Sequence, residues 1–190
     1  MSCVTGSFDN QVVDLIKQGG VGFLPTDTIY GLSCLALNQA SVDKIHKLKD
    51  RAAHKPFIIL ISNTKMLDLL SIDSKDTMLV QKYWPGALSI ILPDAKGPSW
   101  LTLNTATLAV RIPGNDQLRQ LIDAVGPIVS TSANLQGQQP INSVAVAQKV
   151  FGKQLDFYVD FGKLDNPPST LVAIKGGKLD VVRQGAVKID

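Results

Sequence analysis

An apolar run leads directly into a cluster of short polar side chains in the stretch Pro127-Ile128-Val129-Ser130-Thr131-Ser132-Ala133-Asn134. Its apolar half has the composition of a buried strand. Its polar half supplies hydroxyls, a side-chain amide and backbone N–H groups, all suited to binding phosphate or carboxylate. Capping of the following turn explains the same residues equally well. The stretch therefore predicts a buried strand whose end is a candidate anion site.

A separate basic segment carries Lys49, Arg51 and Lys55. Lys49 and Arg51 are two positions apart, so an extended segment presents both side chains on one side, whereas a helix separates them. We therefore expect residues 49–55 to form a loop between a helix and a strand. In such a loop Arg51 supplies a bidentate fork and the lysines supply point charges for a polyphosphate. An ordinary solvated loop is the alternative, and it is the commoner outcome for a charged loop.

Three further segments place polar side chains next to predicted strands. Residues 25–32, which include Thr26, follow the first predicted strand, where open α/β sheets place ligand loops. A simple turn is the alternative there. Arg111 interrupts an apolar strand, so it is either a sheet-edge ion pair or a cation of the site. Arg183 has the same two explanations.

The composition fits one compact domain over residues 1–190. Hydrophobic residues make up 45% of the chain and charged residues 18%, which excludes disorder and favours a buried sheet. The formal net charge is only +3, so bulk electrostatics does not indicate a nucleic-acid surface. Cys3 and Cys34 lack zinc-type spacing and are expected to be reduced thiols.

The N-terminal residues lack the basic and apolar pattern of a secretion signal. No apolar stretch approaches the roughly 18 residues that span a bilayer. We therefore expect a cytoplasmic protein with no membrane partner.

Apolar spacing and turn residues predict an irregular alternation of helices and strands. Helices are expected around Val42 and Leu118 and over 8–17, 66–70, 76–83 and 143–150. Strands are expected over 21–25, 57–61, 87–92, 107–112, 127–130 and 157–161. A hairpin of 170–174 and 179–183 around Gly176-Gly177 predicts antiparallel strands at one end of the sheet. The expected fold is α/β, with a twisted mixed parallel and antiparallel sheet and packed helices.

Familiar phosphate and hydrolase motifs are missing from the sequence. It contains no P-loop, no dinucleotide-binding glycine fingerprint and no nucleophile elbow of the α/β-hydrolases. A weak alternative is a penicillin-binding-like serine hydrolase, because Ser41-Val42-Asp43-Lys44 matches S-x-x-K. Ser132-Ala133-Asn134 and Lys175-Gly176-Gly177 match the other two elements of that enzyme class only loosely.

Several short motifs together resemble the YrdC-domain family of threonylcarbamoyl-AMP synthases, in the bacterial single-domain form. They occur in the order Pro25-Thr26-Asp27-Thr28, Lys49-x-Arg51, Lys55-Pro56, Leu108-Ala109-Val110-Arg111, Ser130-Thr131-Ser132-Ala133-Asn134, Pro168-Ser169-Thr170 and Arg183-x-Gly185. Each motif is weak alone, but their shared order and spacing are specific. The sequence departs from the family pattern at Ala52, Phe57 and Gln136.

The resemblance implies a reaction and a set of ligands. L-threonine and bicarbonate would form an adduct that attacks ATP, giving threonylcarbamoyl-AMP and pyrophosphate. Mg²⁺ would accompany the ATP, and threonylcarbamoyl transferase proteins would use the product to modify the tRNA adenosine next to the anticodon. The resemblance also implies a concave, positively charged cavity. A non-catalytic RNA-binding module that uses the same basic cavity is the alternative, although aromatic residues make up only 6% of the chain.

On this resemblance, specific residues are expected to bind each substrate. Lys49, Arg51 and Arg183 would hold the ATP phosphates, and Ser132 and Asn134 would complete that catalytic cradle. The residues expected to bind threonine and bicarbonate are Thr26, Lys55, Arg111, Ser130, Ser169 and Thr170. No resident metal site is expected.

Overall fold

The computed structural model describes residues 2–49, 57–93, 95–135 and 137–190. Within these ranges ten strands form one sheet. The strands are β1 (Cys3–Thr5), β2 (Gly22–Leu24), β3 (Gly31–Leu35), β4 (Ile58–Leu60), β5 (Leu88–Leu92), β6 (Leu108–Arg111), β7 (Ile128–Ser132), β8 (Phe157–Val159), β9 (Thr170–Lys175) and β10 (Lys178–Arg183). Their order across the sheet is β1-β8-β2-β3-β7-β4-β6-β5-β9-β10.

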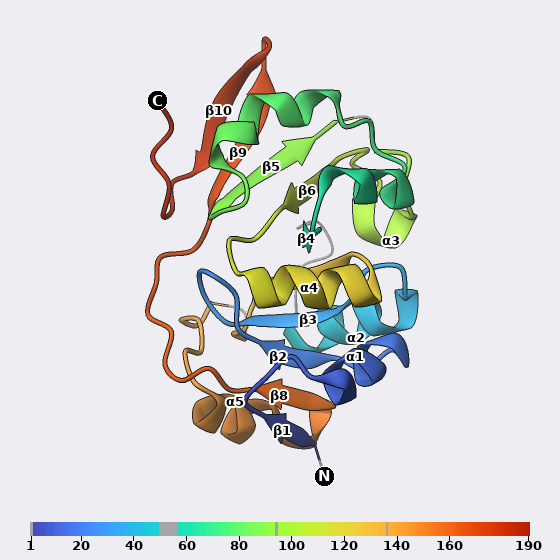
Figure 1. The fold of residues 1–190 in the computed structure, drawn as a ribbon, viewed down its shortest axis with the longest axis vertical. Coiled ribbons are helices and arrows are strands. Elements are labelled where there is room, and N and C mark those ends of the chain that lie inside the picture. The colour runs from blue at the N-terminus through green and yellow to red at the C-terminus, as the bar shows by residue number, and fades with distance from the viewer. Residues whose placement is uncertain (1, 50–56, 94, 136) are drawn as a thin grey trace.

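The sheet is mixed and strongly twisted, as predicted. Parallel ladders join β1 to β8, β8 to β2, β4 to β6 and β5 to β9, and the other neighbours are antiparallel. Figure 1 shows the strands stacked from β1 at one end to the β9–β10 hairpin at the other. The predicted hairpin at one end of the sheet is therefore confirmed.

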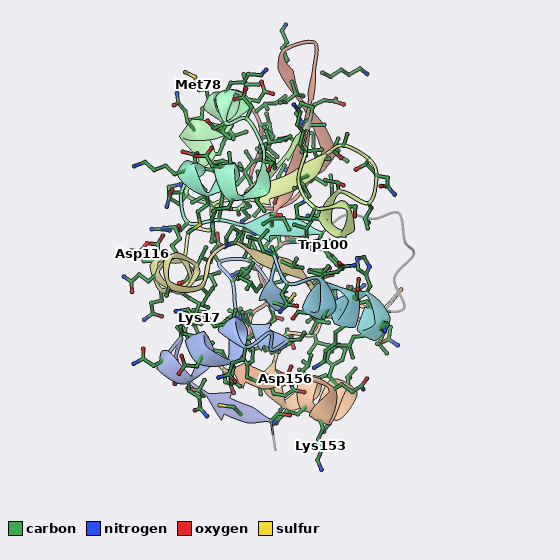
Figure 2. The ribbon with its side chains drawn as sticks, turned by 90° about the vertical axis from the view of Figure 1, so that its right-hand side faces the viewer. Lys17, Met78, Trp100, Asp116, Lys153 and Asp156 are labelled. Carbon is green, nitrogen blue, oxygen red and sulfur yellow. The ribbon has the colours of Figure 1, made fainter. Side chains whose placement is uncertain are left out.

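Helices cover both faces of the sheet. The helices are α1 (Asn10–Lys17), α2 (Gln39–Lys49), α3 (Ser99–Thr102), α4 (Asp116–Val125) and α5 (Val144–Phe151), with 3₁₀ segments η1 (Thr64–Leu70), η2 (Lys75–Tyr83) and η3 (Gly152–Gln154). In Figure 2, Lys17 of α1 and Asp116 of α4 lie on one side of the sheet, and Trp100 of α3 and Lys153 of η3 lie on the other. No helix within the described ranges is long and apolar enough to cross a bilayer.

Alternating side chains build one apolar cluster on each face of the central strands. Ile128 of β7 and Leu60 of β4 pack with α1 and α4. Their neighbours Val129 and Ile59 belong to the larger cluster that includes α2 and α5. Because successive strand residues point to opposite faces, a single apolar run supplies both clusters.

Several sequence predictions were wrong in detail. Gly31 and Leu32, expected in a loop, begin β3, a strand without β-branched residues that is buried between β2 and β7. Strand β1 and helix α3 were not predicted. Lys49 is the last residue of α2 and not the first of a loop; Arg51 and Lys55 lie outside the described residues.

Candidate active site

One cavity of about 660 Å³ is lined by residues from several strands of the sheet. Its walls come from the loop before β3, from β4, β6 and β7, and from the β9–β10 hairpin. On β4 the lining residues are Ile58 and Leu60, which alternate along the strand, and on β7 they are Ser130, Thr131 and Ser132. Its volume is within the range that small-molecule and cofactor sites occupy.

The end of β7 forms a hydroxyl-lined rim that Lys49 supports. The Lys49 ammonium donates to the Ser132 backbone oxygen, to the Asn134 backbone oxygen at 3.0 Å and to Asn134 Oδ1 at 2.8 Å. Ser132 Oγ donates to the same Oδ1 at 2.7 Å. Lys49 is only 4% exposed, and the cavity is lined by Ser130, Thr131 and Ser132. Lys49 and Asn134 thus hold the rim in place.

The loop between β2 and β3 forms a second polar wall. Thr26 Oγ1 donates to the Ile29 carbonyl at 2.7 Å and accepts from the Thr28 N–H at 3.1 Å. The two threonine hydroxyls lie 3.0 Å apart. Gly31 follows, and a Cβ there would lie 2.5 Å from Ser130 Oγ. The absence of a side chain at Gly31 lets this loop and the β7 rim meet in one cavity.

Arg111 lines the cavity, and each of its three guanidinium nitrogens also contacts a protein group. Its Nε donates to the Gly86 carbonyl at 2.9 Å, its Nη1 to Thr28 Oγ1 at 3.1 Å, and its Nη2 forms an ion pair with Asp27. Asp27 Oδ2 also accepts from the Gly114 N–H at 2.8 Å. Of the two alternatives for Arg111, an ion pair or a cation of the site, the structure shows the ion pair in a residue that also lines the cavity. Strand β6 lies between β4 and β5, so the pair is not at a sheet edge.

Arg183 is the second cation of the cavity wall. Its Nη2 donates to the Ser169 carbonyl at 2.8 Å and lies 3.3 Å from Ser169 Oγ. Ser169 Oγ is in turn 3.0 Å from Ser89 Oγ, inside the sheet. Burial lowers the pKa of Arg183, and the positive charge of Arg111 lowers it further. Arg111 on β6 and Arg183 on β10 therefore both line the cavity.

The cavity wall includes many of the residues that the sequence predicted, namely Thr26, Arg111, Ser130, Ser132, Ser169 and Arg183. Thr170 is fully buried and pairs in register with Leu88 of the large cluster, so its side chain faces away from the cavity. Sequence reasoning did not single out Asp27, Thr28 or Ser89. The Thr26-Asp27-Thr28 alternation was the available signal for the first two. Among the described residues, no group of three metal-binding side chains occurs.

Comparisons with known proteins place these observations in a family. The family model for Sua5, YciO and YrdC proteins, described as "Telomere recombination", matches residues 14–185. The threonylcarbamoyl-AMP synthase of Pseudoalteromonas translucida is 34% identical over 174 residues, which cover 88% of this chain and 93% of that protein. The synthase of Coxiella burnetii is 33% identical over 173 residues, with the same coverage.

Solved structures show the same fold. The P. abyssi Sua5 structure complexed with L-threonine has a TM-score of 0.86 and 27% identity, and the match covers 97% of this chain but 58% of that one. The present chain thus spans little more than half of the P. abyssi protein. E. coli YciO has a TM-score of 0.86 and 25% identity, with 99% and 98% coverage. The chain belongs to the Sua5/YciO/YrdC family.

Proposed function

We propose that the protein is a threonylcarbamoyl-AMP synthase, a nucleotidyltransferase that converts L-threonine, bicarbonate and ATP into threonylcarbamoyl-AMP and pyrophosphate. The observation that carries this proposal is the cavity in which Arg111 and Arg183 meet the hydroxyls of Thr26, Ser130 and Ser132. The names of the relatives at 33–34% identity, and the threonine bound by P. abyssi Sua5, supply the substrate class.

The reaction needs positioning and charge neutralisation more than covalent participation by the protein. A carboxylate oxygen of the N-carboxy adduct of threonine attacks the α-phosphorus of ATP. The bond from that phosphorus to the bridging oxygen breaks, and pyrophosphate leaves. A fixed cation near the phosphates stabilises the charge that develops, and a walled cavity keeps water from the reactive mixed anhydride.

The two arginines suit different tasks. The hydrogen bonds of Arg183 to Ser169 come from its Nη2. We assign the other N–H groups of its guanidinium to the phosphates of ATP. Arg111 is bound by Gly86, Thr28 and Asp27, so we assign it to holding the threonine-binding loop while adding positive charge to the cavity. The hydroxyls of Ser130 and Ser132 would complete the phosphate cradle. Arg51 and Lys55 keep the phosphate and substrate roles expected from the sequence.

We propose that Mg²⁺ enters as part of its complex with ATP. Phosphate oxygens and waters are the ligands that Mg²⁺ prefers, and dedicated protein cages for it are uncommon. Ser132 lines the cavity, and its Oγ, which donates to Asn134, can still accept from a water of such a complex. When bound, the ion neutralises phosphate charge. Asp27 directly follows Thr26 in the sequence, but its carboxylate already forms an ion pair with Arg111.

The activity can be tested directly. Purified protein is incubated with ATP, Mg²⁺, bicarbonate and one amino acid at a time, and the adenylate is measured by mass spectrometry together with pyrophosphate. We expect product with L-threonine. The absence of any adenylate while ATP is bound would reject the proposal.

A matched pair of variants tests the role of the cavity. Arg183→Ala should lower threonine-dependent pyrophosphate release about 10²–10³-fold, the usual cost of removing one preorganised charge-stabilising group. Lys178→Ala removes a cation from the exposed start of the same strand and should leave turnover unchanged. Equal losses in both variants would contradict the assignment.

The product would be consumed by threonylcarbamoyl transferase proteins that modify tRNA, and we accordingly propose a cytoplasmic site of action. Direct contact with tRNA is part of this proposal and is checked by salt-dependent RNA binding. RNA binding without any adenylate formation would favour a non-catalytic RNA-binding module instead.

A further inference from the structure

An irregularity in the β9–β10 ladder determines where Arg183 points. Val181 pairs with Val172, but Arg183 pairs with Leu171, so the register shifts by one residue between them. In a regular antiparallel ladder Arg183 would lie opposite Thr170, whose side chain faces away from the cavity. Because partners in a ladder share a face, the shift turns Arg183 to the side of Leu171. Val182, Arg183 and Leu171 all line the cavity.

The hydroxyl of Thr170 binds the chain just beyond this bulge. Thr170 Oγ1 accepts from the Gly185 N–H at 2.9 Å and from the Val187 N–H at 3.1 Å, and it donates to the Val187 carbonyl at 2.6 Å. Thr170 is fully buried, and its three bonds reach backbone groups of half-buried residues. The Thr170 side chain therefore bonds to the backbone of residues 185–187, which follow the end of β10.

Close backbone packing reinforces the same segment. The Ala186 N–H donates to the Pro168 carbonyl at 2.9 Å, and a Cβ on Gly185 would lie 2.2 Å from that oxygen. Pro168 and Ser169 form the neighbouring part of the cavity wall, and Ser169 accepts from Arg183. The segment 185–187 thus packs against the residues that Arg183 contacts.

We propose that Thr170 is a positioning residue for Arg183. By fixing residues 185–187, its hydroxyl holds the bulge at Val182 and so keeps the guanidinium of Arg183 in the cavity. The proposal rests on the proposed function in one respect, because it takes ATP as the ligand of Arg183. It replaces the expectation that Thr170 itself contacts threonine.

The test compares Thr170→Val, which removes the hydroxyl at nearly constant volume, with Thr170→Ser, which keeps it. Affinity for Mg²⁺·ATP is measured by calorimetry, and amide hydrogen exchange is measured at Gly185 and Val187. Thr170→Val should weaken ATP binding about tenfold and speed exchange at both amides, and Thr170→Ser should restore both. Thr77→Val removes another buried hydroxyl, which donates to the Ser74 carbonyl at 2.6 Å in η2, and should change neither readout.

A double variant separates positioning from general loosening. On an Arg183→Ala background, Thr170→Val should cost little further ATP affinity, because its effect passes through Arg183. An additive loss, an unchanged ATP affinity in Thr170→Val, or failure of serine to rescue would each overturn the proposal. If Thr170→Val does not fold, Gly185→Ala takes its place, because the added Cβ displaces the same segment.

The outcome also distinguishes this inference from the proposed function. If the wild-type protein binds ATP but forms no adenylate, the synthase activity is rejected. The ATP affinities of the variants then still test the role of Thr170. Wild-type protein that binds no ATP would overturn the positioning role itself.

Discussion

Lys49 and Arg111 are two cations whose hydrogen bonds in the structure go to protein groups. Both were predicted as cations that touch substrate. In the structure the ammonium of Lys49 binds oxygens of Ser132 and Asn134, and the guanidinium of Arg111 binds Gly86, Thr28 and Asp27. The sequence states the charge of each side chain. The groups that pair with that charge lie in segments that are distant along the chain.

Removal of the Lys49 ammonium tests its supporting role. Lys49→Met should lower the free energy of unfolding by about 1–3 kcal/mol, because it removes the charge-assisted hydrogen bonds from a buried ammonium to Ser132 and Asn134. Lys47→Met, on the exposed face of the same helix, is the control and should be nearly neutral. Urea denaturation measures both. Equal stability of the two variants would show that the rim does not depend on Lys49.

The Arg111–Asp27 pair makes a second prediction at this scale. The two side chains are 4% and 16% exposed, so Arg111→Met leaves a nearly buried carboxylate unpaired and should cost about 3–5 kcal/mol. Adding Asp27→Asn should recover part of that loss. Arg119→Met breaks a pair whose partner Asp116 is 79% exposed and should cost at most about 1 kcal/mol. Chemical denaturation of the wild type, the two single variants and the double variant measures these differences in stability. A double variant no more stable than Arg111→Met would argue against charge burial as the cause.

Among the secondary-structure elements, those with clear local signals were predicted, and strand β3, which lacks such a signal, was missed. Helix α4 has Asn115 as its cap and apolar residues at helical spacing, and the β9–β10 hairpin has its glycine pair. Strand β3 has neither signal. It is buried because β2 and β7 pair with its two sides, and no local pattern specifies that pairing.

The first helix supplies a prediction with a pH dependence. The Thr5 hydroxyl, followed by the Val12 N–H, lowers the pKa of Asp9, which caps α1. A lowered pKa in the folded state means that the ionised cap stabilises the protein above the ordinary carboxyl pKa, and this stabilisation is lost as pH falls through the lowered value. Asp9→Ala should cost about 1 kcal/mol at neutral pH, whereas Asp9→Asn should cost less. Thermal unfolding at neutral and acidic pH measures the difference, and a gap between wild type and Asp9→Asn that widens in acid would contradict it.

At the scale of the whole molecule, the candidate site joins segments from nearly the full length of the chain. Thr26, Ser130 and Arg183 come from the β2–β3 loop, β7 and β10, and the sheet topology alone brings them to one cavity. Motif order identified most of these residues. It did not reveal the register shift that aims Arg183, because one bulge residue leaves no distinct signature in the sequence.

The distribution of thiols offers a test of the global packing. Cys34 is fully buried, and burial raises the pKa of its thiol far above the usual value, whereas Cys3 is partly exposed. A thiol reagent should therefore modify one cysteine in the native protein and two after denaturation. Rapid native labelling of both would show that the core around β3 opens readily.

The edge strand β1 has a consequence for synthesis of the chain. Residues 3–5 leave the ribosome well before their ladder partner β8, residues 157–159. Strand β1 must therefore wait until residues 157–159 have been made before it can pair in the sheet. A nascent chain stalled before residue 157 should expose Val4 and its neighbours to proteases and chaperones, and release of the remaining residues should protect them.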